Sequence, residues 1–125
     1  MTVTLNHTIV HVQDKMASAR FYSEILGLPD AEPYGHFMVL SLRNGVSLDF
    51  LEVRPDISSQ HYAFLVSEEE FDEIIERIRQ RKLGYWADPW HHVPGKINTN
   101  DGGRGVYWSD PDGHNLEILT RPYGG

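Results

Sequence analysis

The chain has 125 residues, the length of one domain and enough to bury a hydrophobic core. Its formal net charge of −7 and the lack of a basic stripe argue against nucleic acid or an anionic membrane as a partner. The sequence has no cysteine, no apolar run as long as a membrane helix and no signal segment, so thiol chemistry is excluded and a cytoplasmic location is expected.

The first half of the chain begins with a predicted strand and a helix. Residues 4–12 alternate as a strand does, and one face would carry Leu5, His7, Ile9 and His11. Asp14 is the predicted N-cap of a helix that runs to about Leu26, and Gly27 is the predicted stop.

A hairpin is predicted next. Strands over residues 36–43 and 46–53 are joined by Asn44 and Gly45, a strong two-residue turn signal. The second of these strands carries Asp49. The polar segment 54–59 then breaks regular structure and is the predicted internal boundary.

The second half repeats this order. Residues 60–66 predict a strand that carries His61, and Ser67 with Glu70 forms a predicted capping box. The helix that follows has an apolar stripe at helical spacing, formed by Phe71, Ile74, Ile75 and Ile78.

The remaining segments predict short strands around one long loop. Residues 85–87 and 105–109 are predicted strands, separated by a loop of about fifteen residues. The turn at residues 111–113 leads into a last strand in which Glu117 shares a face with Asn115 and Leu119.

The two halves preserve polar positions as well as the order of elements. His7 precedes Phe21 by 14 positions, and His61 precedes Ile75 by the same 14. The last strand of each half carries a carboxylate, Asp49 or Glu117. A repeat that keeps polar residues on otherwise apolar faces indicates a function beyond packing.

Two histidines and one carboxylate are a known ligand set for a divalent metal. Imidazole nitrogen and carboxylate oxygen suit iron, nickel, zinc or manganese, and no thiol competes here. The alternative is that Glu117 lies on a solvated sheet face, because a buried carboxylate is costly unless something compensates its charge.

Three stretches of the sequence are informative together: HTIVHVQDKMASARFYSEILGL at 7–28, QHYAFLV at 60–66 and YWSDPDGHNLEIL at 107–119. They resemble the vicinal oxygen chelate superfamily, which includes glyoxalase I, extradiol dioxygenases, fosfomycin-resistance transferases and bleomycin-resistance proteins. The resemblance implies an α+β fold in which two βαβββ modules, 1–55 and 58–121 of a single domain 1–125, form an eight-stranded, partly open cup with flanking helices.

The resemblance also implies one divalent metal per site, with ligands His7, His61 and Glu117. A metal-dependent enzyme would then bind two adjacent oxygens of a small-molecule substrate to that metal. An extradiol-dioxygenase-like reaction is slightly favoured, because the position of the fourth glyoxalase ligand holds Asp49, one methylene shorter than glutamate.

Two alternatives stay open. A glyoxalase I-type lyase would use Asp49 as a fourth ligand or as a base, and a non-catalytic binder of a bleomycin-like cation would leave the intact ligand set unexplained.

The resemblance implies a homodimer, in which His7 of one chain completes a site with His61 and Glu117 of the other. A cup built within one chain is the alternative.

Five further residues are candidates for the substrate pocket. His11 lies on the His7 face but roughly 13 Å along the strand, at about 3.3 Å per residue, so it is a structural or substrate-facing residue. His91 and His92 lie in the long loop and are either acid–base groups or solvated side chains. Tyr107 is predicted to face the cup, and Arg104, among glycines, either holds an anion or is solvated.

Overall fold

A computed structural model describes residues 2–123 and has the predicted α+β fold. The chain divides into two compact units, Met1–Ile57 and Ser58–Gly125, each built on an open sheet. No helix among the described residues is both long and apolar enough to span a membrane.

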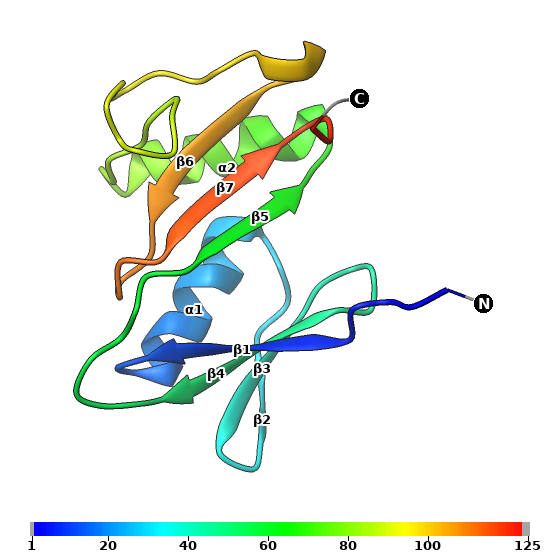
Figure 1. The fold of residues 1–125 in the computed structure, drawn as a ribbon, viewed down its shortest axis with the longest axis vertical. Helices are drawn as coiled ribbons and strands as arrows, with labels where there is room; N and C mark the ends of the chain where they lie inside the picture. Colours follow the sequence, from blue (N-terminus) through cyan, green and yellow to red (C-terminus); the bar gives the residue numbers. More distant parts are fainter. Residues whose placement is uncertain (1, 124–125) are drawn as a thin grey trace. The chain divides into compact units, whose positions relative to one another are not determined.

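Unit 1 is a four-stranded sheet with one helix (Figure 1). The sheet order is β1-β4-β3-β2, and β1 runs parallel to β4. Asp14 caps the helix as predicted, with Oδ1 accepting the Ala17 N–H at 3.1 Å, and Gly27 ends it at φ 71°. The elements are β1 His7–Val12, α1 Lys15–Leu26, β2 Glu32–Tyr34, β3 Phe37–Ser41 and β4 Ser47–Glu52.

Unit 2 is a three-stranded sheet in the order β5-β7-β6, with β5 parallel to β7. The capping box between Ser67 and Glu70 is confirmed. The elements are β5 His61–Leu65, α2 Glu68–Gln80, a 3-10 turn Asn100–Gly102, β6 Gly105–Ser109 and β7 Asn115–Leu119.

The predicted strand at residues 85–87 is wrong. Trp86 makes only isolated bridges, to Pro94 and to Tyr107. Each bridge joins a single residue pair, so residues 85–87 do not form a strand. Over residues 2–123 the two sheets therefore contain seven strands rather than eight.

In each unit one face of the sheet packs on the helix and the other face carries the polar candidates. Helix α1 packs against β3 and β4, and Figure 1 shows α2 behind β6 and β7. The core side chains of unit 1 include Val10, Tyr22, Ile25, Leu40 and Phe50, and those of unit 2 include Phe71, Ile74, Ile78, Trp108, Leu116 and Ile118. Because strand residues alternate, His7 and His61 point away from these cores.

The internal repeat extends to the register of the strands. His7 is paired with Ser47, and His61 is paired with Asn115. Two residues further along each partner strand stand Asp49 and Glu117. Each unit therefore places a histidine and a carboxylate on neighbouring parallel strands, on the same face of the sheet.

Candidate functional site

His61 and Glu117 meet on the face of the unit 2 sheet that α2 leaves uncovered. Nε2 of His61 lies 3.1 Å from Oε1 of Glu117, whose side chain is only 2% exposed. The alternative of a solvated Glu117 is therefore wrong, because β7 is the central strand and its neighbours cover this carboxylate.

The contact made by the other ring nitrogen of His61 shows which of the two nitrogens is protonated. Nδ1 lies 2.9 Å from the backbone carbonyl oxygen of Asn115, and a carbonyl oxygen only accepts hydrogen bonds, so Nδ1 carries the proton. In the neutral ring, Nε2 then presents a lone pair to the Glu117 carboxylate. Two lone pairs at this distance repel each other unless a proton or a metal cation lies between them.

The geometry of this pair fits a divalent metal. Metal–ligand bonds of about 2.1 Å that meet at angles near 90–110° place two donor atoms about 3.0–3.4 Å apart. The 3.1 Å between His61 Nε2 and Glu117 Oε1 falls in that range. Metal-binding histidines also commonly donate their second ring N–H to a carbonyl, as His61 does to Asn115.

Two tyrosines surround the pair. The Tyr107 ring stacks on the His61 ring with centroids 6.0 Å apart, so Tyr107 faces this site. Burial, a hydrogen bond with Tyr123 and the negative charge of Glu117 raise the pKa of Tyr107 well above its usual value, so its hydroxyl keeps its proton. Tyr123 donates to Glu117 at 2.9 Å from Oε1 and 3.2 Å from Oε2.

Tyr123 is a site residue that the sequence did not predict. This residue follows the last strand in a segment without periodicity, and its only signal was a polar aromatic side chain shortly after Glu117.

In unit 1, His7 and Asp49 line a shared concave surface that encloses a volume of about 510 Å³. Nδ1 of His7 lies 2.8 Å from Asn6 Oδ1, which leaves Nε2 as the unprotonated nitrogen of the neutral ring. Ser47 donates to Asp49 Oδ1 at 2.8 Å. Both polar and apolar side chains line this surface: Asn6, His7, Glu32, Pro33, Tyr34, Phe37, Val39, Ser47 and Asp49.

A complete three-ligand metal site is not gathered in the structure of the described residues. Within residues 2–123 no group of three or more histidine, aspartate or glutamate side chains is arranged to hold a metal ion. Unit 2 supplies the pair His61 and Glu117, and the third expected ligand, His7, belongs to unit 1. His7 would have to join the pair from the same chain or from a second copy.

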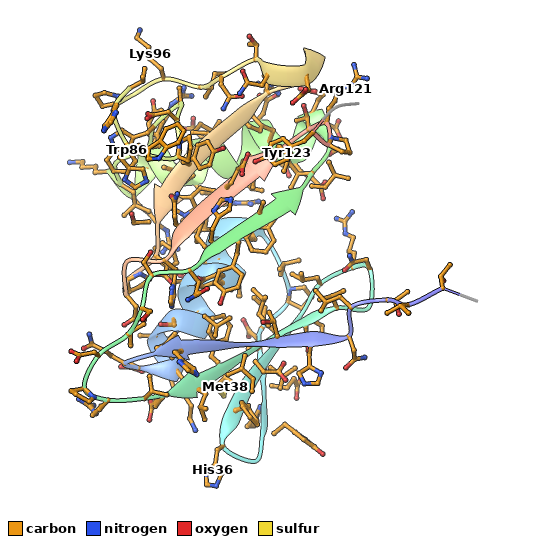
Figure 2. All side chains as sticks on the ribbon, viewed as in Figure 1. His36, Met38, Trp86, Lys96, Arg121 and Tyr123 are labelled. Atoms are coloured by element: carbon orange, nitrogen blue, oxygen red, sulfur yellow. The ribbon has the colours of Figure 1, made fainter. Side chains whose placement is uncertain are left out.

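The loop histidines have different surroundings from each other. His91 stacks on Trp86 at 3.8 Å between centroids, and its Nε2 lies 2.9 Å from Asn115 Oδ1. Figure 2 shows Trp86 beside β6, in the loop that carries this stack. His91 therefore contacts the side chain of Asn115, and the backbone carbonyl of Asn115 contacts His61. His92 is exposed, and its backbone N–H donates to Asp88 at 2.8 Å.

Arg104 was a candidate either for anion binding or for a solvated side chain, and the structure pairs it with two carboxylates. Its Nε lies 2.8 Å from Glu68 Oε1, its Nη1 lies 2.9 Å from Asp72 Oδ1, and its guanidinium covers the Phe71 ring at 4.4 Å. These two carboxylates already neutralise the guanidinium, which fastens the start of β6 to α2.

His11 lies on the exposed face of β1, where its partner in β4 is Leu51. It therefore shares the His7 face, as predicted, at the far end of the strand.

Comparisons with known proteins identify the family of the chain. Residues 4–118 match the family model "Glyoxalase/Bleomycin resistance protein/Dioxygenase superfamily". The chain is 32% identical to the glutathione transferase FosA of Serratia marcescens, over 94% of this chain and 81% of that protein. It is 30% identical to the metallothiol transferase FosB of Lysinibacillus sphaericus, over 96% and 84% of the two chains.

Solved structures give a higher similarity. The structure named "Oxidase ChaP-H1" is 65% identical, with a TM-score of 0.97 over 99% of this chain and all of the other. "Oxidase ChaP-H2" is 63% identical, with a TM-score of 0.98. These findings support a metal-dependent vicinal oxygen chelate enzyme and single out neither dioxygenase nor glyoxalase chemistry. Since the family model covers nearly the whole chain, the protein belongs to the Glyoxalase/Bleomycin resistance protein/Dioxygenase superfamily.

Proposed function

We propose that this protein is a metal-dependent oxidase or dioxygenase that acts on a small molecule with two adjacent oxygen atoms. The observation that carries this proposal is the contact of His61 Nε2 with Glu117 Oε1, in which the proton on Nδ1 leaves two lone pairs facing each other. His7 is the proposed third ligand. Fe(II) is favoured as the metal, with nickel, zinc and manganese as alternatives.

Two neutral imidazoles and one carboxylate leave several positions of a metal open for substrate oxygens. When bound, the metal supplies Lewis-acid polarisation of those two oxygens. The Asn115 carbonyl orients His61, and the Tyr107 ring covers one side of it. The Tyr107 hydroxyl keeps its proton and hydrogen bonds with Tyr123, which links it to Glu117.

Asp49 is the proposed proton acceptor. It lines the same concave surface as His7, and the Ser47 hydroxyl holds one of its oxygens. A hydroxylated aromatic substrate has to lose protons from its hydroxyl groups before it chelates, and a fixed carboxylate in a mostly apolar concavity suits that step. The apolar walls formed by Pro33, Phe37 and Val39 suit a planar ring.

The comparisons favour oxidation over thiol transfer. The two structures named as oxidases are 65% and 63% identical and match nearly the full chain, whereas the two transferases named above are 32% and 30% identical.

A reconstitution experiment tests the reaction. Metal-free protein loaded with Fe(II) under anaerobic conditions is expected to take up dioxygen when air and a substituted catechol are added. Glu117→Gln is expected to abolish this uptake, because it keeps the shape of the side chain and removes its charge. Glu69→Gln, an exposed change on α2, is the matched control and should leave the uptake unchanged.

A glyoxalase I-type lyase is the second candidate, because Asp49 lies beside His7 where a base would shuttle a proton between adjacent carbons. Turnover of a thiol hemiacetal by nickel- or zinc-loaded protein, without dioxygen uptake, would favour it over oxidation. Tight binding of a bleomycin-like cation by protein that takes up no metal would contradict both enzyme proposals.

We also propose a homodimer that completes the ligand set. β1 and β5 are edge strands of their sheets, and they carry His7 and His61. Exposed strand edges are usually covered by another chain or element. Light scattering at micromolar concentration is expected to give the mass of a dimer.

Mixing two defective variants tests whether ligands are shared between chains. In a shared site, His7→Ala and Glu117→Gln chains would form mixed dimers with one intact site, restoring about a quarter of the metal sites after random exchange. No restoration after exchange, with dimers still present, would contradict sharing and place all three ligands in one chain.

A further inference from the structure

We infer that Tyr123 is a positioning residue for Glu117, and that its hydroxyl holds this carboxylate in the orientation that binds the metal. The inference rests on the proposed metal centre. Figure 2 shows Tyr123 over the β5-β7-β6 sheet, and its hydroxyl donates to Glu117, 2.9 Å from Oε1 and 3.2 Å from Oε2.

The two oxygens of Glu117 have different surroundings. Oε1 faces His61 Nε2 at 3.1 Å and is the oxygen that would share a cation with this ring. Once a metal takes Oε1, Oε2 still lies within hydrogen-bond distance of the Tyr123 hydroxyl. A donor on the second oxygen keeps a metal-binding carboxylate from rotating, as outer partners of metal ligands commonly do.

The hydroxyl of Tyr123, rather than its ring, accounts for this placement. The residue is 68% exposed, so burial of the ring contributes little to holding it over the sheet. The hydroxyl by contrast contacts a carboxylate that is 2% exposed, and it also hydrogen bonds with Tyr107. A charge-assisted bond to a buried carboxylate is the strongest contact that this side chain makes.

The backbone before Tyr123 is held in place by hydrogen bonds with Arg104 and by the close approach of Gly103. The Arg104 N–H donates to Thr120 Oγ1 at 2.8 Å, and the Thr120 N–H donates to the Arg104 carbonyl at 3.0 Å. A Cβ at Gly103 would lie 2.6 Å from Thr120 Oγ1 and 2.9 Å from Arg121 Cγ. Because Gly103 lacks a Cβ, the segment lies close against residues 102–104, which fixes the path that leads to Tyr123.

The test compares Co²⁺ binding by wild type, Tyr123→Phe and Tyr85→Phe. Tyr85 is the matched control, because its hydroxyl contacts Arg79 on α2 and not Glu117. Tyr123→Phe is expected to weaken Co²⁺ binding by about 10- to 100-fold, the usual effect of removing an outer partner of a ligand. Tyr85→Phe is expected to bind as wild type does.

The visible spectrum of bound Co²⁺ gives a second readout. Without the Tyr123 hydroxyl, Oε2 is released to bind the metal as well, which raises the coordination number and lowers the molar absorptivity. A purely structural role of Tyr123 would leave this spectrum unchanged. Deletion of residues 123–125 is expected to match Tyr123→Phe in affinity, because the hydroxyl is the group that acts.

Several outcomes would overturn the inference. Binding by Tyr123→Phe within about twofold of wild type would show that the hydroxyl does not position Glu117. Tighter binding would show that the C-terminal segment competes with the metal for the carboxylate. If the deletion variant binds Co²⁺ much more weakly than Tyr123→Phe does, the ring or the backbone of this segment, and not the hydroxyl, positions Glu117. Absence of metal binding by wild type would reject the proposed metal centre itself, which separates that failure from the others.

Discussion

His61→Ala is expected to weaken metal binding by more than about 100-fold, because the change removes a proposed metal ligand and outer partners alone contribute about 10- to 100-fold. The His61 side chain is 45% exposed, so its loss leaves the unit 2 core intact. The expected result is a folded protein that loses its metal on dialysis. Elemental analysis of the dialysed protein and titration against a chelator measure it.

His36→Ala is the control for this variant. His36 is exposed in the turn between β2 and β3, where Figure 2 shows it at the tip of the hairpin. Its removal is expected to leave the metal content unchanged. Full retention of metal by His61→Ala would remove His61 from the ligand set and reject the proposed site.

Glu117→Met is expected to abolish metal binding and to stabilise the metal-free protein. The carboxylate is 2% exposed, and burying a charge costs more than its contacts usually return. Replacing a whole buried ion pair with apolar side chains of similar volume is often stabilising by about 1–4 kcal/mol. The partners that lose the carboxylate here, His61 and Tyr123, are 45% and 68% exposed and can turn to water, so a gain at the low end of this range is expected. For a chain of this size, the melting temperature is expected to rise by on the order of 5 °C.

Thermal unfolding in the presence of a chelator measures this change, and elemental analysis measures the metal. Glu69→Met on the exposed side of α2 is the control, with an expected change within about 0.5 kcal/mol. A lower melting temperature for Glu117→Met would show that His61 and Tyr123 already compensate the buried charge. Loss of metal binding together with a higher melting temperature would show that Glu117 serves metal binding and not folding.

The local structure of this protein follows from its sequence, because short-range signals determine it. Asp14 and Gly27 bound α1, and the Ser67–Glu70 capping box begins α2, as predicted. Alternation along β1 correctly separated His7 and His11 from the buried Val10 and Val12. The spacing of the two halves also predicted a repeat, which appears as the matched register of His7 with Ser47 and His61 with Asn115.

Contacts between distant residues required the tertiary structure. The burial of Glu117 depends on the central place of β7 in its sheet, which alternation alone does not reveal. The Asn115 carbonyl decides which nitrogen of His61 is protonated, and the two residues are 54 positions apart. The partners of Arg104 could not be predicted for the same reason. Glu68 and Asp72 lie on α2, which is more than 30 positions earlier in the chain and comes close to Arg104 only in the folded protein.

The sequence by itself thus determined most of the elements, their caps and the repeat, because each depends on residues within a few positions or on a fixed period, and the family resemblance supplied the candidate ligands. Only the tertiary structure decided that His61 and Glu117 touch and that Tyr123 returns to the same carboxylate. The physical reason is that hydrogen-bond geometry and desolvation depend on every neighbour in space, and β5, β7 and the C-terminal segment become neighbours only after the sheet has formed.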